Sequence, residues 1–191
     1  MKRLFVAIKI KPDKIFMNKF YELKWRLRHD NIKWVEDNNI HITLKFFGET
    51  EEKLFPEIVR VLSGIALETG IFKLSLRKLG IFGSSYDPRV IWVGIEPYDK
   101  LVSSMKLISS RMEPLGFQSD RQNFVPHLTL GRVKLIKDKH FFREVVDQSK
   151  GIESQEITID NFILFESILK KEGPLYTALQ TFTLRKTNID V

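Results

Sequence analysis

The sequence contains no cysteine, so disulfide bonds and thiolate metal sites are excluded. No apolar run approaches the roughly 20 residues that cross a bilayer. The short apolar run at 4–8 ends at Lys9, which favours a first strand over a signal peptide. The chain also lacks a glycine-rich phosphate loop followed by Lys-Ser or Lys-Thr, which excludes a nucleoside triphosphatase of that kind. We therefore expect a soluble, cytoplasmic protein with no membrane partner.

The composition is that of an ordinary globular protein, with 43% hydrophobic and 29% charged residues among 191. The charges are not balanced, because 31 Lys and Arg residues against 24 Asp and Glu residues leave a net charge of +7. A basic surface attracts polyanions over long distances. RNA or DNA is thus a candidate partner, although net charge alone does not decide the question.

Hydrophobic periodicity and turn residues predict strands and helices in mixed order. Strands are expected at 3–10, 32–35, 41–47, 72–82, 90–95, 127–133, 155–169 and 175–184, the last two as a closing hairpin. Helices are expected at 14–28, from a cap at 50–53 to 67, at 100–115 and at 138–148. Similar element orders in the first part of the chain and over 90–149 suggest an internal duplication, with a loop at 120–126 before the second motif.

Two of the four histidines open the same pattern of His, aliphatic residue, Thr and Leu. The two copies are His41-Ile42-Thr43-Leu44 and His127-Leu128-Thr129-Leu130, which begin 86 residues apart. In a strand, alternate side chains share a face, so each histidine lies beside its threonine. Two such faces brought together supply two histidines and two hydroxyls to one pocket.

That set of groups suits acid–base chemistry on a phosphate. Opening a cyclic phosphate needs one group to accept a proton from water and another to donate a proton to the departing oxygen. Imidazole does either near neutral pH. Thr43 and Thr129 can donate hydrogen bonds to the non-bridging oxygens.

Two further residues are candidates for binding substrate. The Arg132 guanidinium matches phosphate geometry, but strict alternation puts it on the face opposite His127 unless Gly131 carries a bulge. Phe47 shares the parity of His41 and is the aromatic residue expected to line the cleft and stack a base. Lys45 has the same parity and is expected to face substrate or solvent.

No metal or cofactor is expected. Neither motif has a second histidine or a carboxylate two to four residues away on its face, as a zinc site usually has. The remaining histidines, His29 and His140, lie near predicted helix ends, and neither is assigned a catalytic role.

The segments around both motifs resemble the 2H phosphoesterases, and within them the RNA 2′,3′-cyclic phosphodiesterases, also called the 2′-5′ RNA ligase family. The resemblance is strongest over 39–48 (NIHITLKFFG) and 124–132 (FVPHLTLGR) and extends to 3–8, 89–94 and 173–176. It implies an α+β fold in which two antiparallel sheets, related by a pseudo-twofold, flank a central cleft with helices outside. Residues 1–191 would form a single bilobal domain whose lobes contribute 41–44 and 127–130.

The resemblance also implies an activity. It is the metal-free hydrolysis of a terminal RNA 2′,3′-cyclic phosphate to a 2′-phosphomonoester, with His41 as proton donor and His127 as acceptor. The expected partner is RNA with such an end, including tRNA fragments, bound by a monomer. Three alternatives stay open: a 2′-5′ RNA ligase or 2′-5′ phosphodiesterase using the same site, a small cyclic nucleotide as substrate, and a non-catalytic RNA-binding module.

Overall fold

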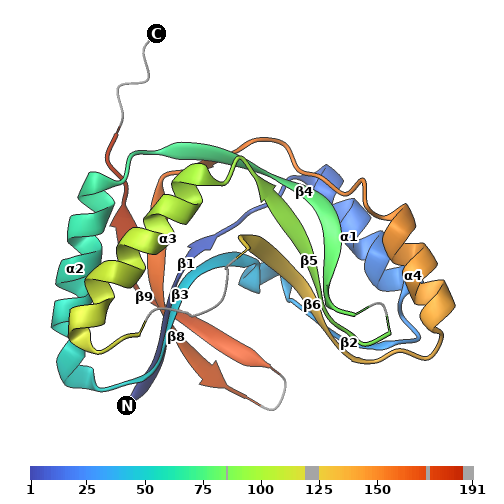
Figure 1. Cartoon of the computed structure of the whole chain (residues 1–191), viewed down its shortest axis with the longest axis horizontal. Helices are drawn as coiled ribbons and strands as arrows, with labels where there is room; N and C mark the ends of the chain where they lie inside the picture. Colours follow the sequence, from blue (N-terminus) through green and yellow to red (C-terminus); the bar gives the residue numbers. More distant parts are fainter. Residues whose placement is uncertain (85, 119–124, 171–172, 187–191) are drawn as a thin grey trace, which may run out of the picture.

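The protein is described by a computed structural model over residues 1–84, 86–118, 125–170 and 173–186 (Figure 1). Its strands form two antiparallel sheets. The first sheet holds, in spatial order, β3 (His41–Thr50), β1 (Lys2–Lys9), β8 (Asn161–Leu169) and β9 (Pro174–Thr183). The second holds β2 (Asn31–Trp34), β6 (His127–Leu135), β5 (Pro88–Glu96), β4 (Phe72–Gly83) and β7 (Ile157–Ile159).

The helices cover the outer faces of the sheets (Figure 1). The second sheet is covered by α1 (Lys14–Arg26) and α4 (Lys139–Gln148), and the first lies beside α2 (Phe55–Glu68) and α3 (Asp99–Met112). Short 3₁₀ turns are η1 (Asp37–Asn39), η2 (Glu52–Leu54) and η3 (Glu113–Leu115). Asp13 and Asp138 begin α1 and α4 by accepting hydrogen bonds from backbone N–H groups of the first turn.

One continuous hydrophobic core joins both sheets and all four helices. It includes Val6 of the first sheet, Leu128 of the second and Phe16 of α1, none of which is exposed. A smaller cluster on the opposite face of the first sheet consists of Phe5, Ala7 and Phe165 with Ile163 and Tyr176 packed against it. The first sheet is therefore apolar on both faces, and one of these faces carries His41, whose ring contacts Phe5.

The structure confirms the predicted α+β class with two antiparallel sheets. The single strand predicted over 155–169 is wrong, because the chain changes sheets at Asp160: β7 pairs with β4 of the second sheet, and β8 pairs with β1 and β9 of the first. β3 also continues to Thr50, past the predicted stop at Gly48. Residues 119–124 of the predicted loop lie outside the described residues.

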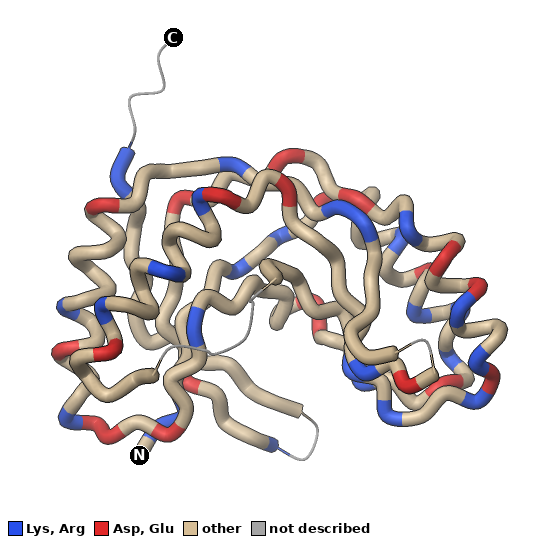
Figure 2. The backbone as a smooth tube through the Cα atoms, viewed as in Figure 1, with Lys and Arg blue, Asp and Glu red and all other residues tan. Residues whose placement is uncertain are grey.

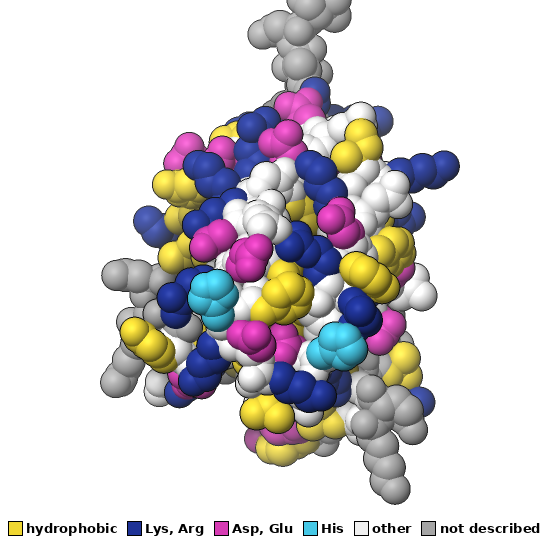
Figure 3. Space-filling model, turned by 90° about the vertical axis from the view of Figure 1, so that its right-hand side faces the viewer, with side chains coloured by type: hydrophobic (Ala, Val, Ile, Leu, Met, Phe, Trp, Pro, Cys, Tyr) yellow, Lys and Arg dark blue, Asp and Glu magenta, His cyan; other side chains and the backbone are white. Residues whose placement is uncertain are grey.

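The surface over α1 and α4 carries acidic and basic side chains intermixed (Figure 3). The two helices together carry six Lys and Arg residues against three Asp and Glu residues, so part of the excess positive charge lies on this outer face. Among the described residues, no helix is both long and apolar enough to pass through a bilayer.

Candidate active site

Both predicted histidines occupy the first residue of a strand, and the two strands meet. His41 begins β3, which pairs with β1, and His127 begins β6, which pairs with β5. β3 and β6 contact each other although they belong to different sheets. The fold thus brings together two motifs that lie 86 residues apart in the sequence.

The two imidazoles are anchored in the same way. The Nδ1 atom of His41 lies 2.5 Å from the carbonyl oxygen of Asn39, and the Nδ1 atom of His127 lies 2.8 Å from that of Val125. A carbonyl oxygen only accepts, so Nδ1 carries the hydrogen in both rings. In the neutral form the lone pair is then on Nε2, which is the nitrogen that exchanges protons.

Aromatic rings hold both imidazoles edge-on. The His41 ring centroid lies 5.4 Å from that of Phe5 and 5.3 Å from that of Tyr176, with an interplanar angle of 83° to Tyr176. The His127 centroid lies 4.8 Å from that of Phe82 at 89° and 6.3 Å from that of Trp92. These rings fix the imidazole planes and exclude water from one side of each.

Burial lowers the pKa of both histidines, and the positive charge of Arg132 lowers it further, against the raising effect of the Nδ1 hydrogen bonds. Both rings are consequently more neutral at pH 7 than an exposed histidine. A bound phosphate anion acts in the opposite sense and favours the charged imidazolium. The site is therefore suited to gain a proton together with an anionic ligand.

Thr43 and Thr129 lie two residues after the histidines, on the same strand faces and half-buried. Thr43 is opposite Ala7 of β1, and Thr129 is opposite Trp92 of β5. Their hydroxyls are therefore placed beside the imidazoles, as the alternation predicts.

A bulge in β3 overturns the expected position of Phe47. The register passes from Ala7 opposite Thr43 to Val6 opposite Lys45, so β3 carries one extra residue at Leu44–Lys45. The faces exchange beyond this point. Phe47 is 8% exposed and packs on Phe117 in the core at a centroid distance of 4.9 Å, so the prediction that it lines the cleft is wrong.

Phe46 takes the place that was expected for Phe47. It is 57% exposed, and its ring lies 5.8 Å from Phe5, which also contacts His41. Lys45 is turned the other way and is only 2% exposed, which corrects its expected position on the His41 face. Its ammonium donates to the carbonyl oxygen of Gln118 at 2.8 Å and to Ser109 Oγ at 3.3 Å.

The bulge proposed at Gly131 is present in β6. Trp92 lies opposite Thr129 and Ile91 lies opposite Gly131, so Leu130 is the extra residue and Arg132 returns to the His127 face. A Cβ on Gly131 would lie 2.9 Å from side-chain atoms of both Ile32 and Trp34, so only glycine lets β2 approach so closely.

The charge of Arg132 reaches both halves of the site. It contributes to the lowered pKa of His41 and of His127. Burial raises the pKa of Tyr176, and the charges of Arg132 and Arg3 partly oppose that rise. The Arg132 charge therefore acts on ionisable groups of both sheets.

Sequence reasoning missed the aromatic surroundings of the histidines: Phe5, Phe82, Trp92 and Tyr176. Alternation along each strand could have indicated which aromatic residues share a face with the histidines. That inference also requires the register between paired strands, which bulges shift in the β1–β3 and β4–β5 pairs. Among the described residues, no group of three or more His, Asp or Glu side chains gathers as a metal site would require.

Comparison with known proteins identifies the family. The family model of the 2′-5′ RNA ligase superfamily matches residues 20–169. An RNA 2′,3′-cyclic phosphodiesterase of Methanocaldococcus jannaschii is 35% identical, with 93% of this chain and 98% of the relative covered. One from Archaeoglobus fulgidus is 33% identical, with 94% and 99% covered.

Solved structures agree in fold. The protein TT0787 of Thermus thermophilus superposes with a TM-score of 0.78 at 26% identity, over 96% of this chain and 98% of that one. E. coli LigT in its apo form superposes with a TM-score of 0.70 at 22% identity, over 97% and 98%. The paired His-x-Thr strands and these matches over nearly the whole length lead to one conclusion: the chain belongs to the 2′-5′ RNA ligase superfamily.

Proposed function

We propose that the protein hydrolyses the terminal 2′,3′-cyclic phosphate of RNA to a 2′-phosphomonoester, with His41 as general acid and His127 as general base. The observation that carries the proposal is the matched anchoring of the two histidines, each with Nδ1 on the carbonyl oxygen two residues earlier, around the charge of Arg132. The names of the relatives from M. jannaschii and A. fulgidus support the same reaction.

In the proposed step, Nε2 of neutral His127 removes a proton from water as the water oxygen attacks phosphorus. The bond from phosphorus to O3′ breaks, and Nε2–H of protonated His41 delivers its proton to O3′. The phosphate stays on O2′, and the two imidazoles have exchanged protonation states. A second proton exchange with solvent restores the resting enzyme.

The other polar groups act on the phosphate. The Thr43 and Thr129 hydroxyls donate to the non-bridging oxygens, where negative charge builds up during attack. Arg132 neutralises the same oxygens in a bidentate manner. The phosphate charge in turn raises the pKa of His41, so substrate binding itself generates the acid that the reaction needs.

The family name favours a second activity, 2′-5′ RNA ligation, at the same site. In ligation the 5′-hydroxyl of a second RNA replaces water as the nucleophile: His127 takes its proton, the bond from phosphorus to O3′ breaks, and His41 protonates O3′, which leaves a 2′-5′ linkage. The matched histidines argue against a non-catalytic RNA-binding module, because binding alone needs no proton exchange.

tRNA fragments are the natural RNAs that we propose as substrates.

One chain supplies both histidines, so a monomer suffices, with the two sheets as the lobes of a single domain. We propose that it acts on RNA in the cytoplasm.

The direct test is incubation of an oligonucleotide ending in a 2′,3′-cyclic phosphate with the protein in EDTA, followed by identification of the product isomer. We expect the 2′-phosphate with no need for added metal. An unchanged substrate, or activity that EDTA abolishes and a divalent cation restores, would contradict the proposal. His140→Ala is a matched control, because His140 is an exposed histidine on α4.

A further inference from the structure

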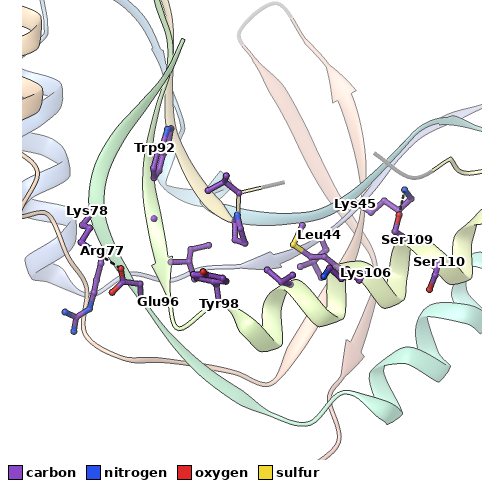
Figure 4. A pocket seen from close by; sticks show the side chains of 16 residues that line it. Leu44, Lys45, Arg77, Lys78, Trp92, Glu96, Tyr98, Lys106, Ser109 and Ser110 are labelled. Carbon is purple, nitrogen blue, oxygen red and sulfur yellow. Dashed lines mark hydrogen bonds and ion pairs between the residues drawn. The ribbon is translucent and has the colours of Figure 1, made fainter. Parts of the chain in front are cut away.

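A groove of about 780 Å³ adjoins the His127 side of the site (Figure 4). It lies between α3 and strands β4 and β5 of the second sheet, and Trp92 forms part of its wall. The Trp92 ring also contacts the ring of His127, at a centroid distance of 6.3 Å. Val125 and Pro126, which precede His127, complete the wall at this end. The groove therefore ends next to His127, with Trp92 between its wall and the imidazole.

The groove has an apolar floor and a cationic rim. Leu44, Ile95 and Met105 line it together with the aromatic residues Trp92 and Tyr98. The charged lining residues are Lys45, Arg77, Lys78, Lys106 and Glu96. Lys78 pairs with Glu96 at 3.3 Å and Arg77 with Glu153 at 3.8 Å, so Lys45 and Lys106 are the lining cations without an ion pair among the described residues. Figure 2 shows basic segments on both α3 and β4, on the two sides of this space. Apolar and aromatic surface with a basic border is the pattern that binds a nucleotide strand.

Lys45 and Lys78 each occupy an unfavourable position at the groove, Lys45 because it is buried and Lys78 because of its backbone conformation. Lys45 is buried, and the acceptors of its ammonium are the neutral Ser109 hydroxyl and Gln118 carbonyl groups. A buried cation beside neutral partners favours the approach of an anion. Lys78 has a φ of 63°, which costs a residue with a Cβ, and it lies at a bulge in β4. Lys78 already pairs with Glu96, whereas a phosphate bound in the groove would supply Lys45 with an anionic partner that the described residues do not give it.

We propose that this groove binds the RNA chain on the 5′ side of the terminal nucleotide, with a base on the apolar floor and a phosphate on the cationic rim. The proposal rests on the proposed function, because the cyclic phosphate between His41 and His127 sets which end of the strand enters the groove. It makes the enzyme selective for oligonucleotides over mononucleotide cyclic phosphates.

The test compares two substrates with the same terminal nucleoside: adenosine 2′,3′-cyclic monophosphate, and a trinucleotide that ends in that nucleotide. We expect a higher kcat/KM for the trinucleotide. Lys106→Glu should lower the trinucleotide value about tenfold and change the mononucleotide value less than about twofold, because only the longer substrate reaches the rim. Lys100→Glu is the matched control, since Lys100 is exposed on the same helix but outside the groove lining.

A second pair tests volume in place of charge. Ser110→Trp puts a bulky ring at an exposed position of the groove wall, and Ser103→Trp makes the same change on α3 outside the groove lining. Only Ser110→Trp should selectively impair the trinucleotide. If both substrates lose activity equally, or if neither groove variant discriminates between them, the groove does not hold the RNA chain. An inactive wild-type protein on both substrates would instead refute the proposed function, so the two failures are distinguishable.

Discussion

The two halves of the site, one on β3 and one on β6, each contain a one-residue bulge at the same distance from the histidine. The residues at and after the bulge differ between the two strands. In β3 the bulge falls at Leu44–Lys45, and in β6 it falls at Leu130–Gly131, three and four residues after His41 and His127. The next residue returns to the histidine face in both strands. That residue is Phe46 in the first half and Arg132 in the second, so equivalent positions present an aromatic ring and a guanidinium.

The neighbours of each strand explain the difference at the bulge itself. β3 is the edge strand of its sheet, and Lys45 turns inward to hydrogen-bond Ser109 of α3. β6 is an interior strand, and the equivalent Gly131 leaves room for β2. A repeated motif thus provides two imidazoles with the same anchoring, and the surrounding elements make the two halves chemically distinct. We infer that the second half adds Arg132 to the phosphate contacts of the two threonines, and that the first half presents Phe46 to the terminal base.

The largest effects should come from the histidines. His41→Ala and His127→Ala should each lower turnover on a cyclic-phosphate oligonucleotide by on the order of 10²–10⁴-fold, the usual loss for a positioned acid or base. Substrate binding and the melting temperature should change little, because both histidines are only half-buried. Steady-state kinetics with His140→Ala as control measures this. Full activity in either variant would show that catalysis does not need both histidines, which would contradict the proposed mechanism.

Arg132→Ala should come next, with a loss in kcat of about 10²–10³-fold, as for removal of one oxyanion donor. The positive charge lowers the pKa of both histidines, so its removal should raise both. His127 must be neutral and His41 protonated, so both limbs of the pH–rate profile should move to higher pH. NMR titration of the free enzyme reads the same shift directly. An unmoved titration would place the guanidinium away from the imidazoles.

The adjacent pair Phe46 and Phe47 sharpens the comparison by separating function from stability. Phe47→Ala should destabilise the fold by about 3 kcal/mol, because it empties a core position. Phe46→Ala should leave the melting temperature nearly unchanged and raise KM for RNA. Thermal unfolding and kinetics on both variants distinguish them. The reverse result would mean that β3 lacks the bulge and that strict alternation holds.

The smallest effect concerns Gly131. Gly131→Ala should cost about 1–3 kcal/mol, because the added methyl group would meet Ile32 and Trp34. Denaturant unfolding measures this, with Gly151→Ala as the control, since a Cβ at Gly151 meets nothing within 4 Å. Equal stability of the two variants would show that β2 can move away from β6 without cost.

The family resemblance of the motif segments was sufficient to predict the α+β class, and the duplicated pattern with period-two alternation was sufficient to place His41 and His127 on strands. The sequence was insufficient to place Phe47 and Lys45, because the bulge in β3 arises from its pairing with β1 and is not evident from the sequence of β3 alone. Arg132 was predictable only because Gly131 precedes it, whereas Lys45 gives no such hint. The groove beside Trp92 combines α3, β4 and β5, so only the tertiary fold reveals it.

The central claim is that two histidines with matched geometry have opposite proton roles. The most direct test is the turnover of a nucleotide nitrophenyl phosphodiester, whose leaving group needs no proton, by His41→Ala and His127→Ala. We expect His41→Ala, which lacks the acid, to hydrolyse this substrate at nearly the wild-type rate, and His127→Ala, which lacks the base, to remain impaired. Restoration of His127→Ala alone would reverse the assignment, and equal behaviour of the two variants would contradict the division of roles.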